Sequence, residues 1–326
     1  MTTYAVRMHR NGGPNVLQWE EFEPGSPKAG EALIRHEAVG LNFIDVYHRT
    51  GLYPLPQLPA IPGMEGAGIV EAVGAGVEGI RAGDRVAYAG LPTGAYAQKR
   101  TIPAHRLVAV PDAISLPDAA AMLLQGMTAR YLLKGCYTVG KGTTLLIHAA
   151  AGGVGTIVCQ WARALGATVI GTVGSQEKAE LARSNGCHYP ILYTNDNWVQ
   201  SVLTVTGHQG VDVVYDSVGQ ATFMKSLECL KPMGMMVSFG QSSGAIPPVD
   251  LSILAQKGSL FLTRPSLMTY TEKREDLLAH ANDLFDVVLN GGVTIQIGQT
   301  YALKEAAKAH QDLEARKTRG ATVLMV

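Results

Sequence analysis

Short apolar runs separated by turn residues occupy roughly the first 115 positions of the chain. Runs that are rich in β-branched residues and bounded by glycine occur at 33–39, 68–73 and 84–88, and this pattern predicts β-strands. The segment 51–63 contains four prolines, which interrupt the hydrogen-bond ladder of a sheet, so we expect a loop there. The first part of the chain is therefore predicted to be rich in strands.

The pattern changes near Pro117, which precedes a run of strong helix formers and marks the start of a predicted helix. Beyond it, the apolar run 144–147 is typical of a strand buried on both faces. Apolar residues then step by three and four along 155–165, which indicates a helix. Further apolar segments continue the series of strands at 168–173, 211–215 and 234–239. Strands that alternate with helices predict an α/β fold with a doubly wound parallel sheet.

The last sixty or so residues return to a mixed pattern, with an amphipathic helix expected at 274–289 and a final strand at 321–325. The strand-rich first segment is the natural partner for this final strand. The sequence contains no internal repeat and no low-complexity tract.

Composition narrows the possible functions. The chain has 326 residues, which suggests two domains, and 47% are hydrophobic while 17% are charged, which excludes a disordered chain. The 27 basic and 27 acidic residues balance, so there is no general attraction to nucleic acid. No apolar run of about eighteen residues occurs, and the first residues lack the apolar stretch of a signal peptide. We therefore expect a cytoplasmic protein without a membrane span.

Four cysteines are scattered along the chain, at 136, 159, 187 and 229. Their spacing fits neither a disulfide framework nor a zinc-binding pattern. Free thiols in a cytosolic protein are the simplest interpretation.

The segment His148–Gly155 joins a buried strand to an amphipathic helix and is the strongest chemical signal in the sequence. Its backbone N–H groups and the helix N-terminus form a site for a pyrophosphate. Gly152 allows a close backbone approach, and Gly155 allows the helix to pack closely on the strand. Ala150 replaces the first glycine of the usual G-x-G-x-x-G pattern. The alternative is a tight turn that binds no ligand.

The position about twenty residues further on distinguishes NAD from NADP, because an acidic residue there binds the ribose 2′-hydroxyl of NAD. This chain has Gly174 and Ser175 there, and Lys178 follows. A lysine and a hydroxyl without a carboxylate favour a 2′-phosphate, and a charge-assisted hydrogen bond contributes roughly 1.5–3 kcal/mol. NADPH is therefore the predicted cofactor, although Lys178 could also be an ordinary exposed lysine.

Four motifs together resemble those of a known family: A-A-A-G-G-V-G at 149–155, N-F-I-D at 42–45, P-G-M-E-G-A-G at 62–68 and V-V-Y-D-S-V-G at 213–219. The chain resembles the medium-chain dehydrogenase/reductase superfamily and, within it, the bacterial NADPH:quinone oxidoreductases related to ζ-crystallin. The resemblance runs essentially from end to end. It implies a GroES-like substrate domain (1–124 and 267–326), a Rossmann NADPH-binding domain (125–266), and a homodimer with 259–263 as a strand at the subunit edge.

Departures from the zinc alcohol dehydrogenases of that superfamily imply an enzyme without zinc. Asn42 stands where those enzymes carry a zinc-ligating cysteine, and Met64 stands where they carry a ligating histidine. Their cluster of four closely spaced cysteines is absent. Amide and thioether groups are poor zinc ligands beside thiolate and imidazole.

The resemblance also implies the site residues. The residues placed around substrate and nicotinamide are Asn42, Asp45, Tyr47 and Tyr53. The cofactor-binding residues are Phe43, Thr128, Tyr131, Ala151, Gly152, Gly153, Val154, Gly155, Gly174, Ser175, Lys178, Tyr193, Ser217, Phe239, Gly240, Ser242, Arg264, Pro265, Ser266 and Arg316. The sequence also allows simpler roles for four of these side chains: Tyr47 and Tyr53 as surface aromatics, Asp45 as a helix cap and Arg264 as a subunit contact.

A quinone accepts hydride readily, so the protein need only hold the ring in position and exclude water. Asn42, Tyr47 or Tyr53 could donate a hydrogen bond to the developing oxyanion, and no general acid is identified. One alternative is the reduction of an activated C=C bond in an enone. An alternative of another class is an RNA-binding or crystallin-like protein, against which the zero net charge counts.

Overall fold

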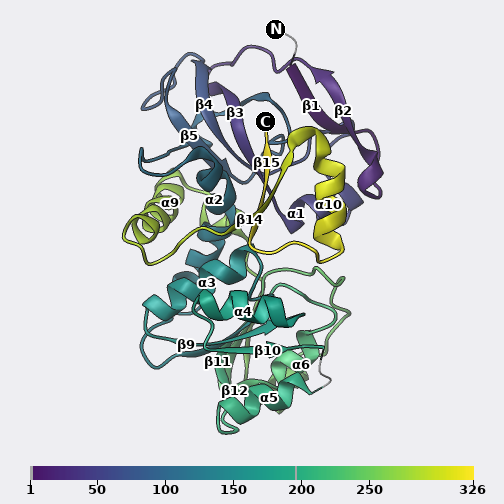
Figure 1. The fold of residues 1–326 in the computed structure, drawn as a ribbon, viewed down its shortest axis with the longest axis vertical. Coiled ribbons are helices and arrows are strands. Elements are labelled where there is room, and N and C mark those ends of the chain that lie inside the picture. The colour runs from purple at the N-terminus through teal and green to yellow at the C-terminus, as the bar shows by residue number, and fades with distance from the viewer. Residues whose placement is uncertain (1–2, 195–196) are drawn as a thin grey trace. The chain divides into compact units, whose positions relative to one another are not determined.

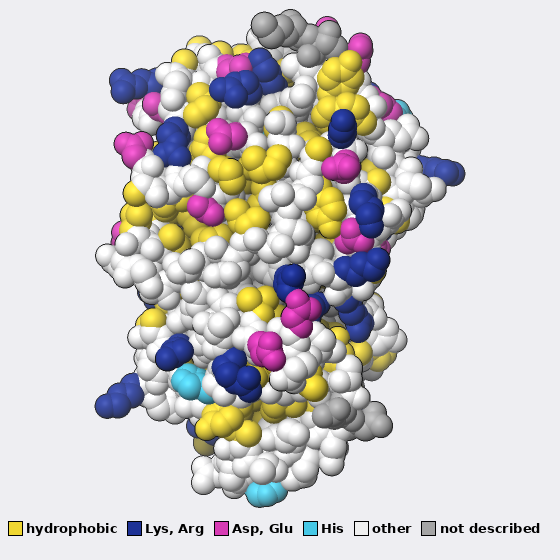
Figure 2. All heavy atoms as spheres, viewed as in Figure 1, with side chains coloured by type: hydrophobic (Ala, Val, Ile, Leu, Met, Phe, Trp, Pro, Cys, Tyr) yellow, Lys and Arg dark blue, Asp and Glu magenta, His cyan; other side chains and the backbone are white. Residues whose placement is uncertain are grey.

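The structure is a computed structural model that describes residues 3–194 and 197–326. Its contacts divide the chain into two compact units (Figure 1). Unit 1 comprises Met1–Met127, Tyr270–Leu289 and Ile295–Val326, and unit 2 comprises Thr128–Thr269 and Asn290–Thr294. On the face drawn in Figure 2, positive and negative side chains are interspersed on both units.

Unit 1 contains a seven-stranded sheet in the order β14-β15-β3-β4-β5-β7, with β6 paired to β3, and a separate antiparallel pair, β1-β2. The strands are β1 (Thr3–Met8), β2 (Leu17–Phe22), β3 (Glu31–Leu41), β4 (Glu65–Val73), β5 (Arg85–Ala89), β6 (Lys99–Pro103), β7 (Val108–Ala109), β14 (Ile297–Ala302) and β15 (Ala321–Met325). The strands expected at 33–39, 68–73 and 84–88 coincide with β3, β4 and β5 to within a few residues.

The chain's final strand joins this first sheet, as the sequence predicts. β15 pairs antiparallel with β3 and parallel with β14 (Figure 1). Val323 and Leu324 are fully buried, and Leu324 packs in the same apolar cluster as Ile34 and Val70. Burial of these side chains removes apolar surface from water and therefore makes the C-terminal segment part of the core of unit 1.

The helical segments of unit 1 surround this sheet and connect its strands. They are η1 (Pro14–Val16), α1 (Phe43–Thr50), η2 (Ala104–Arg106), α9 (Arg274–Leu289), η4 (Leu303–Glu305) and α10 (Ala306–Glu314). Helix α2 (Leu116–Arg130) starts in unit 1 and continues into the π-helical segment η3 (Tyr131–Cys136) of unit 2, and α8 (Leu267–Tyr270) lies at the other boundary. Helix α1 ends at Gly51, whose φ of 84° is in the left-handed region. The segment 51–63 forms no strand beyond a single bridge between Met8 and Ala60, so the predicted loop is confirmed.

Unit 2 contains six parallel strands in the order β10-β9-β8-β11-β12-β13. They are β8 (Thr144–His148), β9 (Thr168–Val173), β10 (Tyr189–Leu192), β11 (Val211–Asp216), β12 (Leu230–Ser238) and β13 (Phe261–Thr263). The helices between them are α3 (Gly153–Ala164), α4 (Gln176–Ser184), α5 (Trp198–Val205), α6 (Phe223–Leu227) and α7 (Ser252–Gln256). This order confirms the doubly wound sheet and is the one that binds dinucleotides at the carboxyl ends of its strands.

The core of unit 2 follows from the apolar pattern of its central strands. Leu145, Leu146 and Ile147 of β8 are fully buried, as expected for a strand covered on both faces. Leu146 packs in one cluster with Ile170 of β9 and Val214 of β11. Across the described ranges 3–194 and 197–326, no helix is both long and apolar enough to cross a membrane.

Candidate functional site

The glycine loop of unit 2 connects β8 to α3 through a tight turn. Ala149 has a φ of 55°, so the left-handed residue of the turn is an alanine. Gly155 lies so close to the strand that a Cβ there would be 2.3 Å from the Ala149 carbonyl oxygen. Ala150, which replaces the usual first glycine, fits because Gly171 on β9 has no side chain: a Cβ on Gly171 would be 2.5 Å from the Ala150 methyl. The glycine loop therefore forms the tight turn between β8 and α3 although Ala150 replaces the first glycine of the usual motif.

The start of helix α3 leaves backbone donors available. Gly152 is its N-cap and provides no side-chain acceptor for the first N–H groups of the helix. The following residues that sequence reasoning selected, Gly153 and Val154, form the first turn and are only partly buried. Unsatisfied N–H groups and the positive end of the helix dipole favour an anion such as a pyrophosphate.

The residues after β9 and β10 lie against each other at the same edge of the sheet. A Cβ on Gly174 would be 2.6 Å from the Tyr193 hydroxyl, so the phenol covers the backbone of Gly174. Ser175 is the N-cap of α4, and its hydroxyl accepts the Lys178 backbone N–H at 3.3 Å. Four residues predicted to surround the adenosine ribose are thus neighbours.

The residues after β11, β12 and β13 also converge. A Cβ on Gly240 would be 2.7 Å from the Ser217 carbonyl oxygen, and the Ser242 N–H donates to that oxygen at 3.1 Å. Arg264, directly after β13, donates to the Gly240 carbonyl at 3.3 Å and to the Ser238 carbonyl at 3.1 Å. Phe239 stands between Ser238 and Gly240 in the sequence, and Pro265 and Ser266 follow Arg264.

Four of the expected cofactor residues lie away from the strand ends of unit 2, three of them in helical segments and one after a helix. Thr128 and Tyr131 are buried at the end of α2 and the start of η3, and Phe43 is the first residue of α1. Arg316 follows α10 in unit 1 and has a φ of 57°. Their part in cofactor binding stays a prediction.

In unit 1, the side-chain amide of Asn42 is held at both ends. Asn42, 7% exposed, is the N-cap of α1 and directly follows β3. Its Nδ2 donates to Glu65 Oε2 at 2.7 Å, and its Oδ1 accepts from Gln125 Nε2 at 3.1 Å. The other oxygen of Glu65 accepts the Leu124 N–H at 2.7 Å. The amide orientation is therefore fixed, and one of its two N–H bonds has no acceptor among the described residues.

Asp45 lies in the first turn of α1, three residues after Asn42, and is fully buried. Its Oδ2 accepts the Asn42 backbone N–H at 2.9 Å and the Tyr96 hydroxyl at 3.1 Å. The Met64 backbone N–H also lowers the pKa of Asp45, although no described atom is within hydrogen-bonding geometry of Asp45 Oδ1. Burial dominates these contributions and raises the pKa of Asp45 to about 7. Burial likewise raises the pKa of Glu65 to about 8, and the nearby Asp45 charge raises it further.

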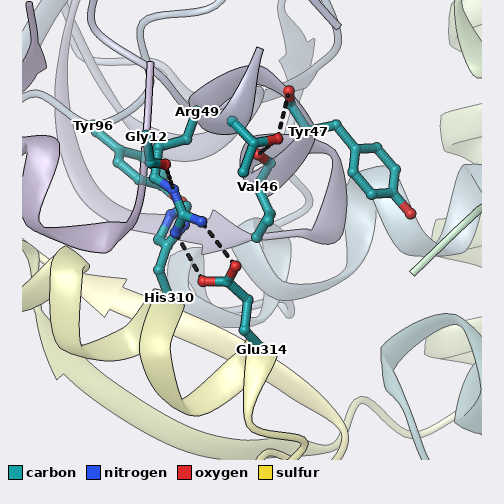
Figure 3. A network of polar contacts seen from close by, with 8 residues as sticks. Gly12, Val46, Tyr47, Arg49, Tyr96, His310 and Glu314 are labelled. Atoms are coloured by element: carbon teal, nitrogen blue, oxygen red, sulfur yellow. Dashed lines mark hydrogen bonds and ion pairs between the residues drawn. The ribbon is translucent and has the colours of Figure 1, made fainter. Parts of the chain in front are cut away.

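A series of polar contacts leads from Asp45 through Tyr96 to α10, and Figure 3 shows the part that includes Tyr96, His310, Arg49 and Glu314. Tyr96 is 3.0 Å from His310 Nε2, and His310 Nδ1 is 3.1 Å from Arg49 Nη1. Arg49 in turn donates to both carboxylate oxygens of Glu314, at 2.8 and 2.9 Å. Helix α1, the loop before β6 and helix α10 are thereby joined through the buried side chains of Arg49, Tyr96 and His310.

Tyr47 and Tyr53 form an aromatic group at α1 and the loop after it. Their ring centroids are 5.1 Å apart in an edge-to-face arrangement, and Phe43 is 6.2 Å from Tyr47. Figure 3 shows that the Tyr47 ring points away from Arg49 and Glu314. The aromatic group and the polar chain therefore leave α1 in different directions.

Sequence reasoning missed five residues of this site: Arg49, Glu65, Tyr96, Gln125 and His310. Glu65 stands within the quoted motif at 62–68, so its position in that motif was an available signal. Arg49 and His310 are 261 residues apart, and no local pattern relates them.

The residues at the positions where zinc alcohol dehydrogenases bind zinc do not fit a zinc ion. Both ends of the Asn42 amide are used in hydrogen bonds, and Met64 offers only a buried thioether. Within the two described ranges, no group of three or more His, Cys, Asp or Glu side chains is arranged to hold a metal.

Comparison with known proteins gives consistent matches over both units. Residues 28–112 match the alcohol dehydrogenase GroES-like domain, and residues 153–283 match the zinc-binding dehydrogenase family. The chain is 50% identical to quinone oxidoreductase of Pseudomonas aeruginosa over 96% of this chain and 97% of the relative. It is 45% identical to 2-haloacrylate reductase of Burkholderia sp, with 98% of each chain covered. The crystal structure of Escherichia coli quinone oxidoreductase complexed with NADPH superposes with a TM-score of 0.97 at 47% identity, covering 99% of this chain and 100% of that one.

The buried acids predict that the free energy of unfolding falls as the pH rises from 6.5 to about 8. Folding raises the pKa of Asp45 from 3.8 to about 7 and that of Glu65 from 4.5 to about 8, so the folded chain binds more protons than the unfolded chain in this window. Below pH 6.5, His36 and His310, whose pKa values fall to about 4 and about 3, give the opposite slope. Each acid contributes of the order of 1 kcal/mol per pH unit.

Urea denaturation at several pH values measures this slope. Glu65→Gln should flatten it, whereas Glu71→Gln, which removes an ion-paired carboxylate from the surface of the same strand, should not. A slope that is the same in the wild type, Glu65→Gln and Asp45→Asn would contradict the assignment.

Proposed function

Because this chain belongs to the quinone oxidoreductase family, we propose that it reduces quinones with NADPH and without a metal. The observation that carries the proposal is the extent of the similarity. At 50% identity it spans 96% of the chain, so it includes both the glycine loop of unit 2 and the Asn42 region of unit 1. A shared fold alone would not support an activity, whereas these regions contain the chemistry.

The residues of unit 2 fit a dinucleotide phosphate. The first turn of α3 offers backbone N–H groups to the pyrophosphate, and the close approach of Gly155 to Ala149 keeps this turn compact. Gly174 and Ser175 follow β9 at the position where a carboxylate would bind a 2′-hydroxyl, and Lys178 comes shortly after them, which favours the 2′-phosphate of NADPH. When bound, NADPH supplies the hydride that reduces the substrate.

The residues of unit 1 orient the substrate and stabilise developing charge. Glu65 and Gln125 fix the Asn42 amide so that its remaining N–H can donate to the oxyanion that forms on a reduced quinone. A donor held in advance needs no reorientation during the reaction, which lowers the barrier. Tyr47 and Tyr53 provide an aromatic surface for a flat ring and help to exclude water. Asp45 is buried behind Asn42, so we assign it a positioning role.

No step of the proposed reaction uses a metal. Asn42 and Met64 form a poor donor set for zinc, and the hydrogen bonds of the Asn42 amide already use both of its ends. A quinone is reactive enough to accept hydride without a Lewis acid.

Reduction of an activated C=C bond is a second candidate function. The observation that favours it is the 45% identity to 2-haloacrylate reductase over 98% of the chain. That substrate class needs a proton at carbon after hydride transfer, and no described side chain is identified as its donor.

The chain is further proposed to act as a cytoplasmic homodimer. The edge strand β13 exposes Phe261 (57%) and Leu262 (38%), and its free edge can pair with a second copy of the same strand. None of the four cysteines forms a disulfide, which suits a reducing compartment.

The activity is tested by following NADPH oxidation with benzoquinone, with phenanthrenequinone and with an enone, each in the presence and absence of a metal chelator. We expect turnover of the quinones that is unaffected by chelation. Turnover of the enone alone would favour the second candidate. Binding of NADPH without turnover of any substrate would refute both reductase functions.

Lys178→Ala should reduce the preference for NADPH over NADH. Loss of a charge-assisted hydrogen bond to the 2′-phosphate corresponds to about a tenfold to hundredfold change in the ratio of kcat/KM values for the two cofactors. Arg183→Ala, at the other end of α4, is the matched control and should leave the ratio unchanged. An unchanged ratio in Lys178→Ala would remove this residue from the 2′-phosphate site.

Phe261→Lys should convert the dimer to a monomer, because a charge replaces an apolar side chain at the edge of β13. Sedimentation equilibrium measures the mass. Met224→Lys replaces another exposed apolar residue, on α6 of the same unit, and should remain dimeric. Wild-type protein with the mass of one chain would refute the dimer.

A further inference from the structure

Arg49 carries a charge that is costly to bury in unit 1. Its side chain is 1% exposed, and it makes a two-pronged ion pair with Glu314 at 2.8 and 2.9 Å. A charge removed from water must be matched by a partner with good geometry. The ion pair uses part of the guanidinium, and another N–H of the same group is directed to His310.

The guanidinium determines which nitrogen of His310 carries hydrogen. Arginine can only donate, so His310 Nδ1, 3.1 Å from Arg49 Nη1, must accept. Burial, together with the Arg49 charge, lowers the pKa of His310 to about 3, so the imidazole is neutral near pH 7. A neutral ring with an accepting Nδ1 carries its hydrogen on Nε2.

This tautomer in turn determines to which neighbour the Tyr96 hydroxyl donates its hydrogen. His310 Nε2 lies 3.0 Å from the Tyr96 oxygen and must donate to it. The single hydrogen of Tyr96 is then free to point to Asp45 Oδ2, 3.1 Å away. With the opposite tautomer, His310 would accept that hydrogen and Asp45 would lose the donor.

In this series of hydrogen bonds, each donor therefore lies on the side away from Asp45: Arg49 donates to His310, His310 to Tyr96, and Tyr96 to Asp45. Asp45 Oδ2 also accepts the backbone N–H of Asn42 at 2.9 Å. Donors of this kind stabilise a carboxylate and not a carboxylic acid. A proton on Oδ1 would have no acceptor, because no described atom is in hydrogen-bonding geometry with that oxygen. The surroundings of Asp45 are arranged for the anion.

We propose that Arg49, His310 and Tyr96 are positioning residues that direct a hydrogen bond onto Asp45, and through its carboxylate fix Asn42 at the start of α1. The inference rests on the proposed function in one respect: it gives a role in quinone reduction to groups that do not touch the substrate. Asp45 accepts the backbone N–H of Asn42, and the side-chain amide of Asn42 is the group proposed to donate to the oxyanion. Protonation of Asp45 weakens this cap and loosens the amide.

Several titratable or charged groups lie on the elements packed around Asp45. They are His48 and Arg49 on α1, Glu65 on β4, Tyr88 on β5, Tyr96 before β6, and His310 on α10. Burial raises the pKa of Asp45, the hydrogen-bond donors lower it, and the result is a pKa of about 7. Loss of one donor would therefore change the charge of Asp45 at neutral pH. Glu65 loses its proton at a higher pH than Asp45, because burial, together with the Asp45 charge, raises the pKa of Glu65 to about 8.

Tyr96→Phe tests the inference, since it removes the donor and keeps the ring. The matched control is Tyr88→Phe, because Tyr88 is equally buried and its hydroxyl is 2.8 Å from His36 Nε2, yet it does not bond to Asp45. Infrared spectroscopy of protein labelled with isotopic aspartate reports the titration of its carboxyl groups, and Asp45→Asn assigns the signal. This readout does not require turnover.

We expect Tyr96→Phe to shift the Asp45 titration upward by about one pH unit, and Tyr88→Phe to leave it unchanged. His310→Phe should shift it upward by less, because Tyr96 remains but is no longer directed. Its conservative counterpart, His310→Gln, can still donate to Tyr96 and should restore the wild-type titration.

The quinone kinetics give the second readout. In Tyr96→Phe, kcat/KM at neutral pH should fall by up to about tenfold and recover at higher pH, following the Asp45 titration. A loss by the same factor at every pH, or an unmoved Asp45 signal, would overturn the inference. A shifted Asp45 signal in a protein that turns over no quinone would support the hydrogen-bond chain and refute the proposed function.

Discussion

The hydrogen bond between Asn42 and Glu65 is the interaction on which the proposed substrate site of unit 1 depends. Glu65 on β4 accepts from Asn42 with one oxygen and from the Leu124 N–H of α2 with the other, so one carboxyl group joins three segments. A buried donor left without its acceptor costs about 1–3 kcal/mol, so loss of the carboxyl would affect all three together. The backbone of Gly40 packs directly against this carboxyl group, since a Cβ on Gly40 would be 2.4 Å from Glu65 Oε2.

The two units use buried aspartates in different ways. Asp216, at the end of β11 in unit 2, accepts the N–H groups of Val218 and Gly219 and the Thr222 hydroxyl, so both of its oxygens are satisfied. Asp45 in unit 1 has one oxygen without a hydrogen-bond partner among the described atoms. The first arrangement holds a loop at a strand end in one conformation. The second leaves a carboxyl whose charge is sensitive to a single neighbouring hydroxyl, which suits the positioning role proposed for Asp45.

The sequence predicts the fold well because the relevant signals are local. The apolar run at 144–147, the stepped pattern of α3 and the glycine loop each lie within a few residues, and they lead to the parallel sheet with its strand-end segments. Gly174 and Tyr193, or Ser217 and Gly240, meet because parallel strands end at one edge, which the fold implies. The Arg49–His310 contact could not be predicted, since helix α10 reaches α1 through tertiary packing that no periodicity encodes. The Glu65 partner Leu124 and the Asn42 partner Gln125 likewise depend on how α2 packs against β4.

The contact between α1 and α10 also has a consequence for biosynthesis. A ribosome produces Arg49 long before His310 and Glu314, and the whole of unit 2 is made in between. A nascent chain of that intermediate length carries Arg49 without its carboxylate and lacks β15 beside β3. Unit 2 can complete its sheet during translation, whereas unit 1 must wait for the last segment, with a polar cluster and a sheet edge open to solvent in the meantime. For the growing chain, synthesis of α10 and β15 is thus the step that completes unit 1.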